Sequence, residues 1–304
     1  MSASGGTKAV IAALLANLGI AVSKFVAYAV TGSASMLSEG VHSLADSGNQ
    51  VLLLLGGRRA QRGSSETHQF GYGRVRYVYG FVVSIILFLV GGAYSLYEGI
   101  HKVQHPEELQ WDTARVALAV LVVAIVLESM SLRTALGEVK HVRGKRSLWR
   151  FIREARQPEL PVVVMEDIGA LTGLVLALGG VVTAVVTGDG RWDGLGAVSI
   201  GILLVVIALV LSVEMSSMLV GESALAEDQA AIASSLSAAG VVRKVIHLRT
   251  VYVGPDELLV AAKVAVEPSL SAADLSSGID EAEAAVRSAV PAARYIFLEP
   301  DIER

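Results

Sequence analysis

One apolar stretch of the sequence, residues 36–57, contains the side chains best suited to binding a cation. His42 and Asp46 are four residues apart, so on a helix they lie on the same face and can ligate one ion. Glu39 precedes His42 by three residues and lies on the same stripe. Because each ionisable group inside a membrane span costs about 2.5–3.5 kcal/mol to insert, three of them on one stripe indicate a function. The alternative is a neutral, hydrogen-bonded pair of His42 and Asp46 that joins two helices.

A second apolar stretch contributes the adjacent acids Glu166 and Asp167 near its start. Neighbouring residues of a helix point about 100° apart, so the two carboxylates are not expected to bind one ion equally. Either of them could complete the set with His42 and Asp46. Imidazole with two or three carboxylates suits Zn²⁺, and also Mn²⁺, Fe²⁺, Co²⁺ and Ni²⁺. The sequence has no cysteine, which excludes disulfides, thiolate zinc sites and iron–sulfur clusters.

The composition indicates that these residues lie in a membrane. Of 304 residues, 53% are hydrophobic and 18% are charged, and the mean hydropathy is +0.57, whereas about a quarter of the residues of soluble domains are charged. The apolar residues fall into blocks of about 20, the length of a helix that crosses a hydrocarbon core about 30 Å thick. The predicted spans are about 8–30, 36–57, 78–100, 113–134, 160–187 and 194–214. The first block lacks the pattern of a cleavable signal peptide, so it is expected to remain as a span.

The basic residues predict the orientation, because cytoplasmic loops are rich in Lys and Arg. The only lysine and arginine residues in segments 31–35, 101–112 and 188–193 are Lys102 and Arg191. The opposite segments contain Lys8, Arg58, Arg59, Arg62, Arg74, Arg76, Lys140, Arg143, Lys145, Arg146, Arg150, Arg153 and Arg156. Both termini are therefore expected in the cytoplasm.

Other polar residues within the spans have simpler explanations. For Asn17 and Asn49, hydrogen bonds between helices are favoured over a role beside the metal. Lys24 and Glu128 are internal charges, and pairing or snorkelling explains them without a function. The glycine pairs Gly91-Gly92 and Gly179-Gly180 are expected to allow close packing of helices, since no lysine or strand of a phosphate-binding loop accompanies them.

The chain becomes more polar after residue 215, so we predict a membrane domain over residues 1–215 and a cytoplasmic domain over residues 216–304. The tail shows a helix over 225–239, strands over 242–253 and 257–266, a helix over 271–289 with Ser271 as its cap, and a strand over 294–299. This α-β-β-α-β order resembles ferredoxin-like folds. The predicted fold is thus an all-α, six-helix membrane domain followed by an α+β domain. Residues 135–158 are predicted to form a basic loop.

Four features follow one another along the chain: Thr31-Gly-Ser-Ala-Ser35 before the second span, His42-x-x-x-Asp46, Phe70-Gly-Tyr-Gly-Arg74 before the third span, and the small α/β tail. With these motifs in this order, the sequence resembles the cation diffusion facilitator family of metal/proton antiporters over nearly the whole chain. The stretch from Ser38 to Gln50, together with Glu166-Asp167, is most similar to the branch that includes the mitochondrial zinc transporter nine. The pattern HxxxD alone is weak evidence for the family, but the whole set of motifs in this order is specific to it.

The resemblance implies a homodimer in which the second and fifth spans of each protomer form a metal site. It implies alternating access, with cytoplasmic metal exported against incoming protons. The metal is then a transported substrate, and no resident cofactor is expected. The local chemistry agrees, because a neutral His42 and ionised carboxylates bind metal, whereas their protonation favours its release.

The chain also departs from the family pattern. Many members have a second HxxxD in the fifth span; here Asp167 occupies its Asp position, but Val163 stands four residues earlier. Glu166 is the expected replacement. Two accessory metal sites of the family are expected to be lost, because other residues occupy their positions: Ser65 and Tyr72 beside His68 in the loop, and Lys263 and Phe297 in the tail. His247 is expected to be a surface or strand residue, and the tail is expected to hold no metal.

We predict an efflux transporter for a divalent transition metal, with zinc/proton antiport as the leading hypothesis. The alternatives are a manganese, iron(II) or cobalt exporter of the same family, or a membrane metal sensor or scaffold that has lost transport. An intramembrane hydrolase would need a pattern such as HExxH, which is not visible. Residues 1–7 lack arginine, so a prokaryotic inner membrane is expected rather than a mitochondrial one. Metal, protons and the lipid bilayer are the expected partners, with no nucleic acid.

Overall fold

The structure, a computed structural model, describes residues 4–31, 34–106 and 111–302. Side chains are described for these residues except at 4–9, 13, 16, 27, 28, 30, 31, 34–42, 45, 112 and 113. By their contacts, the residues form two units, Met1–Arg59 with Arg76–Ser216, and Ala60–Val75 with Ser217–Arg304. Each unit has a hydrophobic core of its own.

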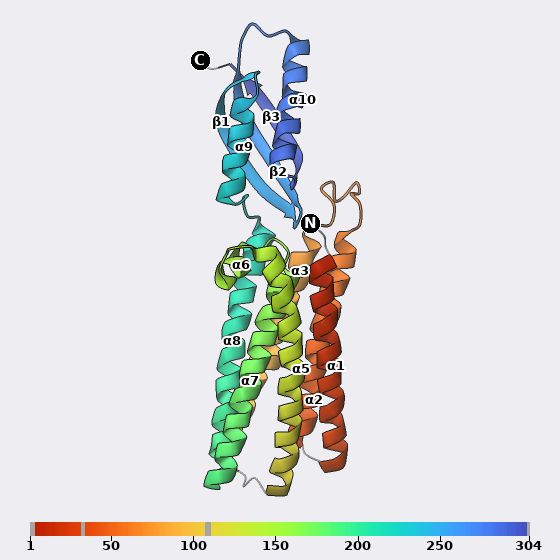
Figure 1. Ribbon diagram of the computed structural model, residues 1–304, viewed down its shortest axis with the longest axis vertical. Helices are drawn as coiled ribbons and strands as arrows, with labels where there is room; N and C mark the ends of the chain where they lie inside the picture. Colours follow the sequence, from red (N-terminus) through yellow and green to blue (C-terminus); the bar gives the residue numbers. More distant parts are fainter. Residues whose placement is uncertain (1–3, 32–33, 107–110, 303–304) are drawn as a thin grey trace. The chain divides into compact units, whose positions relative to one another are not determined.

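Long helices lie side by side in the first unit and form a bundle (Figure 1). They are α1 (Ser4–Thr31), α2 (Ala34–Ala60), the continuous run of α3 (Val75–Ile86), η1 (Leu87–Ala93) and α4 (Tyr94–Gln104), then α5 (Trp111–Arg143), α7 (Glu159–Thr187) and α8 (Arg191–Val220). α1, α5 and α7 pack against one another. Each predicted span lies within one of these helices or within the α3–α4 run.

Four of the described helices are long and apolar enough to cross a membrane: Val75–Gln104, Ala114–Arg143, Glu159–Thr187 and Arg191–Val220. α1 contains a shorter apolar segment, Val10–Val26. α2, with 27 residues, is also a long helix, but it is more polar than the four apolar helices because it carries the predicted metal ligands and several amides and hydroxyls. The predicted fold class, a helical membrane domain followed by an α+β tail, is confirmed. The protein is an integral membrane protein that crosses the bilayer several times.

The third long helix changes its winding in the middle. Between Leu87 and Ala93 it forms π-helical turns, with α-helix on both sides. The sequence predicted one regular helix over residues 78–100, since hydropathy responds to composition and not to the number of residues per turn. π-Helical turns are rare and are found mostly at functional sites. This one directly precedes Tyr94, which lines the cavity described below.

The segment predicted as a basic loop, residues 135–158, is largely helical. α5 continues to Arg143, and a short helix, α6 (Leu148–Glu154), follows it. The Ser147 hydroxyl caps α6 by accepting a hydrogen bond of 3.2 Å from the backbone N–H of Arg150. The prediction of a loop was wrong because the basic side chains end the apolar block, while the helical hydrogen bonds continue beyond it.

Glycines bring the backbones of α4 and α8 close together. A Cβ atom added to Gly99 would lie 2.6 Å from the backbone nitrogen of Val198, and one added to Gly201 would lie 2.7 Å from the backbone nitrogen of Leu96. A Cβ atom added to Gly92 in η1 would lie 3.2 Å from the backbone nitrogen of Val205, and one added to Gly180 would lie 3.0 Å from the carbonyl oxygen of Trp192, so close packing against α8 is confirmed at both glycines. Only glycine permits such an approach of two helix backbones. At Gly179, nothing lies within 4 Å of an added Cβ atom, so the close packing expected there was wrong.

The second unit contains a three-stranded sheet and two helices. The elements are α9 (Ala226–Ala238), β1 (Val242–Gly254), β2 (Glu257–Val266), α10 (Ala272–Ala289) and β3 (Ala293–Asp301). β2 is the central strand, antiparallel to β1 and parallel to β3. α10 forms the crossover between the two parallel strands, and it packs against α9 (Figure 1). The predicted α-β-β-α-β order is confirmed, as is the cap of α10, where the Ser271 hydroxyl accepts from the backbone N–H of Asp274.

The close approach of α4 and α8 can be tested with Gly99→Ala. Its added methyl group must push α8 away, and such overpacking costs about 1–3 kcal/mol, so the midpoint of thermal unfolding in detergent is expected to fall. Gly179→Ala is the control, because nothing lies within 4 Å of its added Cβ atom and alanine favours a helix by up to about 1 kcal/mol over glycine. Equal midpoints for the two variants would contradict the close approach.

Candidate metal centre

Two hydrogen-bonded pairs join α1 to α2 in the first unit. The Asn17 amide donates to Gln50 Oε1 at 3.2 Å, and the Lys24 ammonium donates to the Ser43 hydroxyl at 2.9 Å. The residues of the two pairs are seven positions apart on each helix, which is about two helical turns. The two helices run antiparallel, so the pairs fix the register of α1 against α2. The hydrogen bond between helices predicted for Asn17 is confirmed.

Glu166 of α7 lies against the amide groups of α2. Its Oε1 accepts a hydrogen bond from Asn49 and its Oε2 accepts one from Gln50, both at 3.1 Å. All three side chains are buried. The interhelical hydrogen bond predicted for Asn49 is thus confirmed, and its partner is one of the predicted metal ligands. Two neutral donors hold both carboxylate oxygens in place without neutralising the carboxylate charge.

Asp167, the next residue of α7, faces a different helix. Its Oδ2 accepts a hydrogen bond of 2.8 Å from the Ser131 hydroxyl of α5, and the side chain is only 2% exposed. The two adjacent acids therefore have different supports, an amide pair on α2 for Glu166 and a hydroxyl on α5 for Asp167. This agrees with the angle of about 100° expected between neighbouring helical residues.

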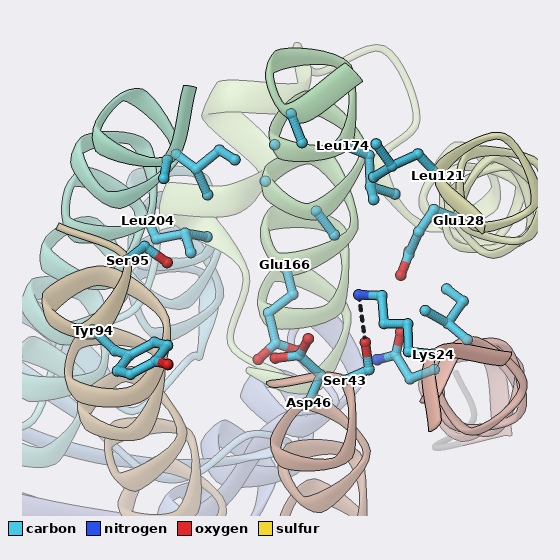
Figure 2. Close-up of a pocket in the computed structure, with 18 of the residues that line it drawn as sticks. Lys24, Ser43, Asp46, Tyr94, Ser95, Leu121, Glu128, Glu166, Leu174 and Leu204 are labelled. Carbon is cyan, nitrogen blue, oxygen red and sulfur yellow. Dashed lines mark hydrogen bonds between the residues drawn. The ribbon is translucent and has the colours of Figure 1, made fainter. Parts of the chain in front are cut away.

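A cavity of about 160 Å³ connects these groups (Figure 2). Six carboxyl groups and two ammonium groups line it: Asp46, Glu98, Glu128, Glu166, Asp167 and Asp193, with Lys24 and Lys102. Apolar side chains such as Leu121, Leu174 and Leu204 complete its walls. The acids outnumber the bases in a bundle with an apolar exterior. Such a cavity is suited to a cation, because the negative charges have few partners of opposite sign.

The structure tests only part of the predicted ligand set. Asp46 lines the cavity, and Figure 2 shows its carboxyl group pointing toward that of Glu166. His42 and Glu39 belong to α2, but their side chains lie outside the described residues. Among the described side chains, no three His, Asp or Glu residues are close enough to hold one metal ion. The set of His42, Asp46, Glu39 and an acid of α7 therefore stays a prediction.

A buried acid on α5 also belongs to this cavity. Glu128 is 4% exposed, and its Oε2 has no hydrogen-bond partner among the described residues. Figure 2 shows its carboxyl group pointing toward the Lys24 ammonium of α1. The sequence explained both residues by pairing or snorkelling. It contained no signal that they would face the same cavity as Asp46, because this depends on how α1 and α5 are rotated about their axes.

The second unit has a lysine between two acids at the tail position where the family's metal site was expected to be lost. Lys263 of β2 lies 3.0 Å from Asp301 and 3.2 Å from Glu299 of β3. Hydrogen bonds to Asp301 and Glu299 raise the pKa of the Lys263 ammonium above its usual range. His247 is exposed on β1 and is paired with Lys263 across the strands. The positive charge between Asp301 and Glu299 is thus that of the Lys263 ammonium.

The loop between α2 and α3 forms a small polar cluster. The ring of His68 stacks on that of Tyr72 at 4.5 Å, and the Ser65 hydroxyl lies 3.3 Å from the Tyr72 hydroxyl. Thr67 Oγ1 lies 3.0 Å from His68 Nδ1. Ser65, His68 and Tyr72 thus interact within the loop through hydrogen bonds and ring stacking.

Residues 10–220 match the family described as the cation efflux transmembrane domain. The match covers more than half of the chain, and the protein therefore belongs to the cation efflux family. The resemblance inferred from the motifs is confirmed at the level of the family.

Individual relatives indicate which branch of the family the chain resembles. The proton-coupled zinc antiporter SLC30A9, mitochondrial, of Xenopus laevis is 32% identical over 269 residues, which cover 87% of this chain and 47% of that protein. Metal tolerance protein C4 of Arabidopsis thaliana is 25% identical over 84% of this chain and 56% of that protein. The chain thus spans about half the length of the curated relatives that it matches. The likeness to the branch of zinc transporter nine is confirmed.

Solved structures add little to this comparison. Two structures of the MamM CTD are 23% and 21% identical and cover 25% and 26% of this chain, and 92% and 100% of their own. Their TM-scores are 0.24 and 0.25, so the description of the second unit rests on its own strand order. The Xenopus relative is named as mitochondrial, so the predicted prokaryotic inner membrane finds no support there and stays a prediction.

The support of Glu166 by α2 can be tested with Gln50→Ala. The change removes a donor to Glu166 and the acceptor of the Asn17 amide. Loss of a group that orients a metal ligand typically lowers metal affinity about 10- to 100-fold, and we expect a loss of this size in zinc titrations of the purified protein. Ser47→Ala is the matched control, because among the described residues that buried hydroxyl bonds only to the Ser43 carbonyl of its own helix. Unchanged affinity in Gln50→Ala would argue against a role for Glu166.

Proposed function

We propose that the protein is a zinc/proton antiporter that works by alternating access. The observation that supports it most directly is that Asp46, Glu166 and Asp167 all line one cavity of a cation efflux domain. A relative with 32% identity is named as a proton-coupled zinc antiporter. We propose His42, Asp46, Glu166 and Asp167 as the zinc ligands, with Glu39 as a nearby carboxylate.

The chemistry of exchange follows from the ligand types. Zn²⁺ and protons compete for the same lone pairs of His42 and the carboxylates, so protonation from one side of the membrane favours release of the metal. Asn49, Gln50 and Ser131 orient the acids of α7 through hydrogen bonds in either state. Oxygen and nitrogen ligands also suit manganese, iron(II) and cobalt; zinc is proposed because of the relative's name.

The course of the cavity supports access from one end of the bundle. Along α7 its lining runs from Glu166 to Ala177, eleven residues or about 16 Å at 1.5 Å per residue. It also includes Lys102 near the end of α4 and Asp193 near the start of α8, and these two residues form an ion pair at 3.0 Å. By the distribution of basic residues, this is the side away from the cytoplasm. We therefore propose that the described conformation faces outward.

We further propose that the protein works as a homodimer with both termini in the cytoplasm, and that residues 216–304 form its cytoplasmic domain. The first proposal rests on the family, and the second rests on the basic residues that flank the spans. Crosslinking in native membranes and protease protection of tags at the two termini would test them separately.

Zinc flux into proteoliposomes with an imposed pH gradient tests the proposed transport. His42→Ala and Asp46→Ala are each expected to reduce zinc uptake to the level of liposomes without protein, because each removes a ligand that α2 supplies. Uptake by the wild type that equals uptake by both variants would exclude the proposed site. A wild type that binds zinc but moves none would instead favour a sensor or scaffold.

The contribution of each acid of α7 can be separated with isosteric changes. Asp167→Asn and Glu166→Gln remove one negative charge each and retain the size of the side chain. If both acids bind zinc, both variants are expected to lose affinity in competition assays with zinc, manganese, iron(II) and cobalt. A loss in Asp167→Asn alone would assign Glu166 to the support of α2 through Asn49 and Gln50.

A further inference from the structure

The carboxyl group of Glu128 has a position of its own in the cavity. It lies on α5, one turn before Ser131, whose hydroxyl bonds to Asp167, and this separation corresponds to a rise of about 4.5 Å along the helix. Glu128 is thus close to the proposed zinc ligands without being adjacent to them in the chain. It is buried, lines the cavity, and has an oxygen to which no described residue donates a hydrogen bond. A buried polar atom of this kind has to be explained.

The charged groups around Glu128 come from three other helices. Lys24 of α1 attracts its negative charge, whereas Asp46 of α2 and Asp167 of α7 repel it. Glu166 of α7 lies within range of the same interactions. The side chain of His42 is outside the described residues. The charge of Glu128 must therefore respond to any change of charge at Asp46 and Asp167, even though the groups share no ligand.

The chemistry of this position favours a proton over a metal ion. A metal site needs several converging lone pairs, and the group toward which the Glu128 carboxyl points is the Lys24 ammonium, which has no lone pair to offer. The Lys24 ammonium, held by Ser43, would also repel a divalent cation at Glu128. A proton requires only one carboxylate oxygen, and its binding removes a charge from an apolar surrounding.

We propose that Glu128 carries a proton in the exchange cycle, separately from the zinc ligands. This inference rests on the proposed zinc/proton antiport. When zinc leaves Asp46 and Asp167, their negative charges favour a proton on Glu128, and an O–H bond forms there as a hydronium ion of the cavity water becomes water. When zinc binds again from the other side, its charge favours the carboxylate, and the proton returns to water on that side.

The test compares two transport modes of one protein in proteoliposomes. Zinc–zinc exchange at equal pH moves no net protons, whereas net zinc uptake driven by a pH gradient requires proton movement. Glu128→Gln retains the shape of the side chain but cannot exchange a proton at the carboxyl group. We expect zinc–zinc exchange within about two-fold of the wild type, together with loss of the stimulation by the pH gradient.

Two further variants complete the comparison. Glu138→Gln is the matched control, because Glu138 lies on the same helix but does not line the cavity, and it is expected to keep both transport modes. Glu128→Asp retains an acid at the same place and is expected to restore the stimulation by the pH gradient, which a role in packing alone would not predict.

The outcomes separate this proposal from the proposed function. A wild type without uptake driven by a pH gradient contradicts the antiport itself. Normal stimulation by the pH gradient in Glu128→Gln overturns the role of Glu128 as a proton carrier. Loss of zinc–zinc exchange together with the stimulation, in a variant with wild-type thermal unfolding, also overturns it, since Glu128 would then bind the metal or shape its site.

If Glu128→Gln does not fold, infrared difference spectra of the wild type and Glu128→Asp decide the question. A carbonyl band of a protonated carboxyl group that disappears when zinc is added, and that shifts in Glu128→Asp, supports the proposal. A zinc-dependent spectrum without such a shift overturns it.

Discussion

Negative charge inside an apolar helical bundle is the condition that organises the first unit. Carboxyl groups are costly to bury, so each acid of the cavity needs donors or a cation nearby. Amides of α2 meet Glu166, a hydroxyl of α5 meets Asp167, and an ammonium of α1 lies near Glu128. The rotation and register of α1, α2, α5 and α7 must all satisfy these contacts together. The site is therefore also what aligns the helices that build it.

Two different kinds of packing hold the bundle. Between α1 and α2, polar pairs two turns apart define the register, and a shift of one turn would break both pairs. Between α4 and α8, glycines allow the two backbones to approach closely, and the ion pair of Lys102 and Asp193 joins the same two helices. The α1–α2 contact therefore depends on polar side chains at matching heights, whereas the α4–α8 contact depends mainly on the absence of side chains at its glycines.

Much of this architecture is visible in the sequence, because the bilayer demands long apolar helices and the tail has regular periodicity. Four of the predicted spans lie in helices long and apolar enough to cross a membrane, and the order of the tail elements agrees with the structure. His42, Asp46, Glu166 and Asp167 were recognised as unusual charges. The partners of the acids were harder to predict. Gln50 and Ser131 look like ordinary polar residues until the neighbouring helices are in place. α6 was missed because its basic residues resemble a loop.

The π-helical turns of η1 have a consequence for the length of the third span. An additional residue within a turn rotates everything that follows by about 100° relative to a regular α-helix. Leu87, at the start of these turns, and Tyr94, directly after them, both line the cavity, and Gly99 further along contacts α8. A chain that lost one residue between Leu87 and Ala93 could keep its hydropathy and its span unchanged. It would nevertheless turn Gly99 away from α8, so insertions and deletions are constrained here more tightly than substitutions.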